Sequence, residues 1–256
     1  MRLVTVGTGT VALTAERSRA CQWLEAGPHR LLMDFGSGTA QRLPALGLPW
    51  PDVSHLLLTH FHPDHHGDLP TLFQAWKHGM MTPRIAPMTI IGPEGTWALL
   101  ERLAQAYGDW ILAPGWPVTL IEIHPGERLP LGHGTVIEAH PVPHTVESVA
   151  YSIERGGRRI VYTGDTGFDA GLAAWARDCD LLLTECSLPA TMPVAGHMTP
   201  EECAELARLA QPRRLVLTHL YPPVERVDIR GIIQEKFTGP LDVAFDGFEV
   251  RIEEDE

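Results

Sequence analysis

The sequence has few cationic residues and no long apolar run, and each shortage excludes a class of protein. Its 256 residues include 20 Lys and Arg against 32 Asp and Glu, for a net charge of −12. Proteins that hold nucleic-acid backbones do so with clustered Lys and Arg, so a generic polyanion binder is excluded. No apolar stretch approaches the roughly 18 residues typical of a membrane-spanning helix, so we expect no membrane partner.

Cysteine is also scarce. The four cysteines lie apart, at positions 21, 179, 186 and 203, without a Cys-x-x-Cys pair. This favours a reduced, cytoplasmic protein over a disulfide framework. The chain starts with a strand-like run at residues 3–6, without the basic and apolar regions of a signal peptide. Because no linker, repeat or low-complexity tract interrupts it, we expect residues 1–256 to form a single domain.

The most informative stretch is residues 56–68, in which an apolar run ends in histidines and aspartates. The apolar run is typical of a buried strand. Pro63 pushes His62 toward an extended conformation, so we expect a tight loop rather than a regular helix throughout. Such a loop lets the first two histidines converge on one point, while the next two polar residues face a second point. The candidate ligands are His60, His62, Asp64 and His65. Imidazole and carboxylate suit zinc, iron or manganese, so the stretch predicts a metal site.

This motif resembles that of the metallo-β-lactamase superfamily, in which it carries most of a two-metal site. The family draws a His, an Asp and a His from later strand ends, and His144, Asp165 and His219 follow apolar runs here in that order. The resemblance implies one metal on His60, His62 and His144, another on Asp64, His65 and His219, and Asp165 as a bridge. It also implies an α+β fold, the four-layer αββα sandwich, with two divalent metal ions, zinc or else manganese or iron, at one edge.

Within the superfamily, the chain resembles the phosphodiesterase branch that includes RNase Z. The likeness lies in the opening Gly-Thr-Gly at residues 7–9, in residues 67–70 after the metal loop, and in Gly-His-Met-Thr at 196–199. In this branch a water shared by the two metals becomes the nucleophile. A His, here His197, is thought to protonate the leaving oxygen, and a Glu, here Glu185, orients it. The candidate catalytic residues are therefore Asp64, His197 and Glu185; the alternative for His197 is a capping or packing role.

One departure from RNase Z bears on the substrate. Only 20 residues separate His144 from Asp165, where enzymes that process tRNA carry a long arm. The basic residues of this segment, Arg155, Arg158 and Arg159, form a small patch at most. We therefore expect a small or cyclic phosphodiester as substrate and no tRNA partner.

Three interpretations of function stay open. The first is a dinuclear metal-dependent phosphodiesterase. The second is a hydrolase of another ester, thioester or lactone, or a tRNA 3′-endonuclease. The third is a metal-bearing binding module without turnover. The flavodiiron relatives are excluded because they carry a glutamate where His62 stands.

Three further features receive specific interpretations. The G-x-G-x-x-A pattern at residues 7–12 is a turn rather than a dinucleotide site, because the next strand begins near residue 21 and leaves little room for a crossover helix. Asp34 either orients a ligand histidine or caps a turn. The aromatic-rich residues 69–117 form core, a substrate mouth or the face of a homodimer.

The remaining patterns predict secondary structure. We expect strands at residues 21–25, 31–34, 88–91, 118–123, 136–141, 149–154, 159–162, 181–184, 215–218, 241–245 and 248–252. We expect helices at residues 39–46, 69–77, 94–107, 200–210 and 229–237. Thr199 and Glu202 predict a capping box, and Gly156-Gly157 predicts a hairpin turn. The acidic residues 253–256 are expected to form a solvated end.

Overall fold

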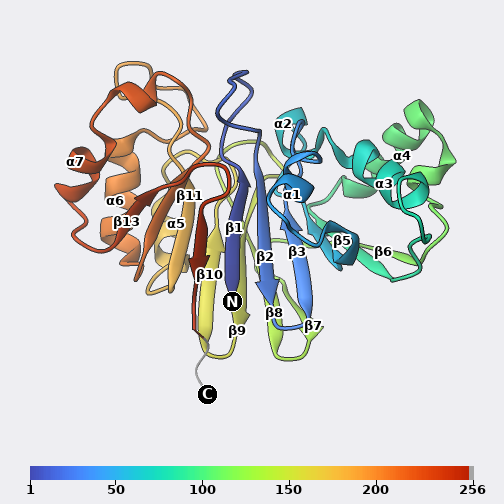
Figure 1. Ribbon diagram of the computed structural model, residues 1–256. Helices are drawn as coiled ribbons and strands as arrows, with labels where there is room; N and C mark the ends of the chain where they lie inside the picture. The colour runs from blue at the N-terminus through green and yellow to red at the C-terminus, as the bar shows by residue number, and fades with distance from the viewer. Residues whose placement is uncertain (254–256) are drawn as a thin grey trace.

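The computed structural model describes residues 1–253 and contains two seven-stranded sheets that face each other (Figure 1). The first sheet has the order β14-β1-β2-β3-β4-β5-β6, and the second β13-β12-β11-β10-β9-β8-β7. The strands of the first are β1 (Arg2–Gly7), β2 (Cys21–Ala26), β3 (His29–Met33), β4 (His55–Leu57), β5 (Met88–Gly92), β6 (Val118–Glu122) and β14 (Glu249–Arg251). Those of the second are β7 (Arg128–Gly132), β8 (Thr135–Pro141), β9 (Val149–Arg155), β10 (Arg158–Tyr162), β11 (Leu181–Glu185), β12 (Leu215–Thr218) and β13 (Leu241–Val243).

Helices cover the outer face of each sheet. Figure 1 shows α1, α3 and α4 outside the first sheet and α5 to α7 outside the second, while α2 lies at the edge where the strands end. The helices are α1 (Arg42–Ala45), α2 (Pro63–His66), α3 (Leu69–His78), α4 (Thr96–Tyr107), α5 (Ala170–Trp175), α6 (Pro200–Ala210) and α7 (Ile229–Gln234). Short 3-10 turns are η1 (Trp50–Asp52), η2 (Asp109–Ile111) and η3 (Val224–Arg226). The predicted four-layer αββα sandwich is confirmed, and among residues 1–253 no helix is long and apolar enough to cross a membrane.

Three apolar cores separate the four layers, and they explain why most strands are apolar on both faces. In β3, Leu31 and Met33 point into the core between the sheets, whereas Leu32 packs under the helices of the first sheet. In β11, Leu183 points between the sheets and Leu182 toward α5 and α6. Because side chains alternate along a strand, a central strand covered on both faces must be a continuous apolar run.

The aromatic-rich segment divides between core and surface. Trp76 and Trp116 are buried, with ring centroids 6.1 Å apart, and the Arg84 guanidinium lies 4.7 Å from the centre of the Trp76 ring. Trp97 is 49% exposed and the Met81 side chain is fully exposed. The core interpretation is therefore right for the first two and wrong for the last two.

The local predictions are mostly confirmed, with bounds shifted by a few residues. Thr199 and Glu202 form the capping box of α6, and Gly156 and Gly157, with φ of 52° and 69°, form the turn between β9 and β10. The elements that were not predicted are β7, α2, α5 and the three short 3-10 turns. In the acidic tail, Glu253 is exposed and residues 254–256 lie outside the described residues.

Candidate metal centre

The loop after β4 turns four polar side chains toward one edge of the sandwich. His62 has extended backbone angles, φ −71° and ψ 143°, and Pro63 occupies the first position of α2. The proline ring excludes helical angles at the residue before it, so the chain changes direction at His62 before the helical turn begins. The predicted tight loop is confirmed, although its second half, from Pro63 to His66, is a single turn of α-helix. This arrangement brings His60 Nε2 within 3.1 Å of His62 Nδ1.

Three strands of the second sheet deliver the other side chains to the same edge. β8, β10 and β12 run in the same direction, since β9 pairs antiparallel with both of its neighbours and β10 to β12 are parallel. His144, Asp165 and His219 follow the ends of these strands. Gly164, just before the aspartate, has φ of +58°, and a Cβ there would stand 2.7 Å from Thr59 Cβ. The close approach of the two loops therefore requires glycine.

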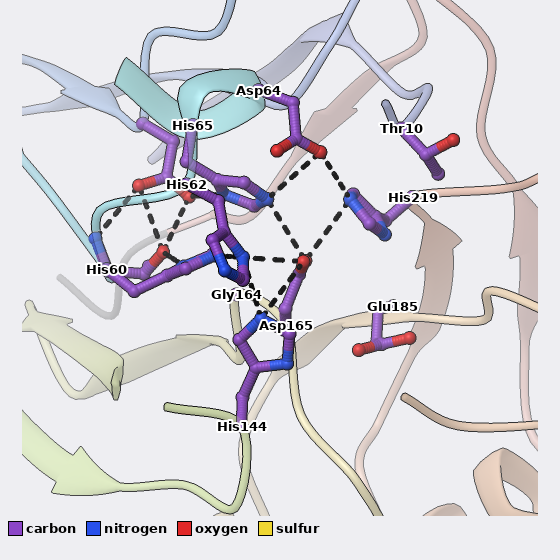
Figure 2. Close-up of polar contacts among 12 residues, drawn as sticks. Thr10, His60, His62, Asp64, His65, His144, Gly164, Asp165, Glu185 and His219 are labelled. Atoms are coloured by element: carbon purple, nitrogen blue, oxygen red, sulfur yellow. Dashed lines mark hydrogen bonds and ion pairs between the residues drawn. The ribbon is translucent and has the colours of Figure 1, made fainter. Parts of the chain in front are cut away.

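The structure brings all seven sequence-predicted ligands together in two groups that share one residue (Figure 2). In each group the donor atoms lie within 4.8 Å of one another. The first group is His60, His62, His144 and Asp165, and the second is Asp64, His65, Asp165 and His219.

Asp165 turns one carboxylate oxygen toward each group. Its Oδ2 lies 3.8 Å from both His60 Nε2 and His144 Nε2. Its Oδ1 lies 3.1 Å from His65 Nε2 and 3.3 Å from His219 Nε2. This is the arrangement expected of a carboxylate that bridges two cations.

Buried donor atoms without partners show that the site fits cations. Within residues 1–253, Asp64 Oδ1, Asp165 Oδ1 and His65 Nε2 are buried and form no hydrogen bond. Buried polar atoms nearly always have a partner, because leaving one without a partner costs about 1–3 kcal/mol. Imidazole and carboxylate are the donors that divalent zinc, iron and manganese accept. Both groups therefore fit a divalent metal ion.

The electrostatics also suit cation binding. Burial lowers the pKa of His60 and His144, which keeps both rings neutral, the form that binds metals. Burial opposes ionisation of Asp165, but the attraction of His219 and His65 outweighs it and holds the pKa of this carboxyl well below its usual value. Burial also disfavours charge on His65, yet Asp165 and Asp34 raise its pKa well above the usual value. A cation at His65 Nε2 must therefore displace a proton.

Asp34 fixes the orientation of His65. Of the two roles predicted for Asp34, the structure therefore supports the orientation of a ligand histidine. Its Oδ2 accepts hydrogen bonds from His65 Nδ1 and from the Tyr162 hydroxyl, both at 2.8 Å. Its Oδ1 accepts from the backbone N–H of Thr59 at 2.9 Å. With Nδ1–H donating to this carboxylate, Nε2 points toward Asp165 and is the nitrogen that a cation would contact.

His197 and Glu185 form a second polar pair beside the donor groups. His197 Nδ1 lies 3.0 Å from Oε1 of the fully buried Glu185, and its ring centre is 4.8 Å from that of His144. Backbone N–H groups of Thr166 and Met198 donate to the same carboxylate at 2.6 and 3.1 Å. Burial alone would lower the pKa of His197, but the hydrogen bond and charge of Glu185 raise it. The capping interpretation of this histidine is wrong, because Thr199 caps α6.

Two supporting contacts were missed by sequence reasoning. The Ser187 hydroxyl lies 3.1 Å from His219 Nδ1 and also donates to Glu185. The backbone carbonyl of Gly196 accepts from His144 Nδ1 at 2.8 Å. The only sequence evidence for Ser187 was its position just after a predicted strand. The carbonyl of Gly196 could not be predicted, because every residue has a backbone carbonyl. Both contacts orient ring nitrogens toward the centre of the site.

Comparison with known proteins agrees with this geometry. Residues 29–220 match the model of the β-lactamase superfamily domain. The chain is 32% identical to an uncharacterised protein of Mycobacterium leprae over 85% of this chain and 76% of that one. It is 30% identical to a ribonuclease Z of Mycolicibacterium gilvum over 96% and 94%. The metallo-β-lactamase fold protein YhfI of Bacillus subtilis superposes with a TM-score of 0.82 at 24% identity, covering 97% and 98% of the two chains.

The contact between Asp34 and His65 generates a prediction about metal affinity. Asp34→Asn keeps the shape but loses the charge that holds the His65 tautomer, so we expect zinc affinity to fall by about 10- to 100-fold. Competition with a chromogenic chelator measures it. Asp246→Asn is the matched control, because Asp246 is also buried and accepts backbone N–H groups, from Thr8 and Ser18. Equal affinity losses in the two variants would contradict the orienting role.

Proposed function

The chain belongs to the β-lactamase superfamily, and we propose that within it the protein is a dinuclear phosphodiesterase that acts on small or cyclic phosphodiesters. The family and the His/Asp clusters mark it as a metallo-β-lactamase-fold hydrolase that uses divalent metal ions. The observation that carries the finer proposal is the His197–Glu185 pair beside the donor groups. Departure of an alkoxide needs a proton donor, and this pair supplies one beside the donor groups.

The ligand assignment follows the two donor groups. We propose that His60, His62 and His144 hold one ion, that Asp64, His65 and His219 hold the other, and that Asp165 bridges them. Zinc is the proposed metal, with manganese and iron as alternatives that the same donors accept. Two such cations supply a hydroxide at neutral pH and positive charge against the developing charge on phosphate oxygens.

The remaining chemistry belongs to the side chains. Asp64 Oδ2 lies 3.4 Å from His219 Nε2, while its Oδ1 is available to hold the attacking water by accepting a hydrogen bond. His197, kept protonated by Glu185, donates its proton to the leaving oxygen. Glu185 cannot turn away, because two backbone N–H groups and the Ser187 hydroxyl also hold it. It acts through the histidine and positions the acid.

The distribution of charge supports a small substrate. The structure extends the predicted arginine patch from three residues to five, since Arg177 and Arg213 line the same hollow of about 570 Å³ as Arg155, Arg158 and Arg159. This hollow lies at the far end of β10 from Asp165, roughly 17 Å of strand away. Three carboxylates, Glu154, Asp178 and Asp180, share it. It therefore offers little positive charge near the donor groups.

A tRNA 3′-endonuclease is the second candidate, because relatives at 30% identity carry the name ribonuclease Z. Against it, the segment between His144 and Asp165 contains only β9, β10 and short connections, with no arm. Hydrolysis of another ester, thioester or lactone uses the same nucleophile, and it ranks below phosphodiester hydrolysis because the relatives at 30% identity that carry the name of an activity are ribonucleases. A binding module without turnover leaves the His197–Glu185 pair without a purpose.

We retain three broader predictions: a single domain over residues 1–256, a homodimer and a cytoplasmic location. The four cysteines, which are buried and free, agree with a cytoplasmic location.

The ligand assignment predicts the metal content. Protein purified without chelator should contain about two equivalents of zinc, iron or manganese by elemental analysis. Asp165→Ala should lose more than one ion's worth of occupancy, because Asp165 faces both groups. Asp169→Ala is the control, because Asp169 lies four residues after Asp165, caps α5 and belongs to neither donor group. Its loss should lower the free energy of unfolding by about 1 kcal/mol and leave the metal content unchanged. Absence of bound metal after reconstitution would contradict the whole ligand assignment.

The proposed general acid predicts a dependence on the leaving group. His197→Ala should lower turnover of alkyl-leaving diesters by about 10²- to 10⁴-fold with metal content intact. The loss should shrink for p-nitrophenolate, which departs without a proton. His140→Ala, which alters a half-buried ring stacked on Trp175, serves as the control and should leave both rates near wild type. Equal losses on good and poor leaving groups would mean that His197 has a structural role.

The charge distribution predicts poor processing of tRNA. The metal-loaded protein should hydrolyse bis-p-nitrophenyl phosphate measurably and should cleave a 3′-extended precursor tRNA weakly or not at all at near-physiological salt, because grip on a polyanion needs many Lys and Arg contacts. Gel analysis of the tRNA measures the second rate. Accurate cleavage after the discriminator nucleotide at a catalytic protein ratio would promote the endonuclease to first place.

A further inference from the structure

A hollow of about 520 Å³ opens beside His197, and nothing in the proposed chemistry so far uses it. Its walls come from three loops at the edge of the second sheet: Pro143 after β8, Gly167 and Phe168 after β10, and the segment from Pro193 to His197 before α6. The ring that we propose as the acid is thus part of the wall. An occupant of the hollow therefore contacts His197.

Two glycines let the loops that wall the hollow pack closely. Gly196 has φ of +82°, and a Cβ there would stand 3.0 Å from His144 Nδ1. A Cβ on Gly167 would lie 3.4 Å from the Pro143 carbonyl oxygen and 3.5 Å from the Cα of Gly196. The backbones of the three loops therefore approach each other directly.

The side chains that reach the hollow are apolar and partly exposed. Phe168 is 37% exposed and Val194 is 50% exposed. A ligand that covers exposed apolar area of this kind gains affinity, because both apolar surfaces are removed from water. An apolar group of aryl size is the ligand that such walls favour.

The charges of the hollow disfavour an anionic occupant. The charge of His197 is balanced by its partner Glu185. Glu202, held by its hydrogen bond to the Thr199 N–H, is the only carboxylate of the walls, and the walls include neither Lys nor Arg. A second hollow, of about 500 Å³, borders Phe61 and Val146 and carries Glu94 and Glu147, but His197 is not part of its walls. Only the first hollow therefore combines an apolar surface with the proton donor.

We infer that this hollow receives the alcohol that leaves, and that Phe168 and Val194 select phosphodiesters whose leaving group is apolar and uncharged. The inference rests on the proposed function and names its substrate class. In the reaction, the oxygen of water forms the new P–O bond, and one water proton passes to bulk solvent. The P–O bond to the leaving group breaks with its electron pair on oxygen, which takes the proton from His197. The products are a phosphomonoester and a free alcohol, and solvent reprotonates His197.

The test uses two substrates that differ only in the leaving group: methyl 4-nitrophenyl phosphate and its 3-carboxy-4-nitrophenyl analogue. The retained methyl group is constant, so a difference in rate between the two substrates comes from the leaving group. Wild-type protein loaded with zinc should show kcat/KM at least about tenfold higher for the uncharged substrate, since the added carboxylate meets the carboxylate of Glu202 and neither Lys nor Arg. Phe168→Ala should lower kcat/KM for that substrate by about tenfold, mainly through KM, because apolar contact is lost.

Three further variants sharpen the test. Phe168→Arg should reverse the preference by supplying a cation, and Val194→Ser should weaken it. Leu112→Ala is the matched control, because Leu112 has the same 37% exposure but lies just after η2, outside the walls of the hollow. Its ratio of kcat/KM between the two substrates should equal that of the wild type.

The outcomes separate this inference from the function beneath it. Turnover of neither substrate by the metal-loaded wild-type protein overturns both. Turnover with a ratio that Phe168→Ala and Phe168→Arg leave unchanged overturns the inference alone, and it would assign the exposed apolar side chains to contact with another macromolecule instead.

Discussion

Seven ionisable side chains that can bind metal lie at one edge of the sandwich with too few hydrogen-bond partners. The arrangement of the rest of the structure depends on this constraint. His62 Nδ1 lies 3.1 Å from His60 Nε2 and 3.0 Å from His144 Nε2, so three ring nitrogens converge on one point. The oxygens of Asp165 face this point and a second one. Such convergence is costly in an isolated protein, because lone pairs oppose each other and buried atoms stay unsatisfied. Cations of charge two at both points remove that cost, so metal binding and stability of this edge are linked.

The scaffold holds the edge in place by layering. The core between the sheets and the two cores under the helices fix the strand ends from both sides. Buried hydrogen bonds then lock individual side chains across the sheets: Asp34 of the first sheet holds His65 and Tyr162, and the Tyr151 hydroxyl donates to the Leu58 carbonyl at 2.7 Å. These contacts fix the orientation of the donor side chains, and such support is the condition for a preorganised site.

The sequence was informative where chemistry is local or repeats in order. The metal loop, the three later ligands and the capping box of α6 were all visible as short patterns next to apolar runs. β7 was missed because Pro130 lowers its strand propensity, and the structure shows why proline is tolerated: β7 is an edge strand. α5 was missed because it has only six residues and contains Gly171. Contacts between residues distant in sequence become visible only in the folded chain. Examples are the contact of Ser187 with His219 and the hollow that Arg213 shares with the arginines of the hairpin.

The proposed hydrolysis of a phosphodiester requires cations at both donor groups. Titration of metal-free protein with zinc, while hydrolysis of bis-p-nitrophenyl phosphate is followed, tests this directly. We expect little activity at one equivalent and a rise to a plateau at two, because the hydroxide nucleophile and the charge on the phosphate oxygens both need cations at the two groups. Full activity at one equivalent, or no hydrolysis of the diester at saturating zinc, would contradict it.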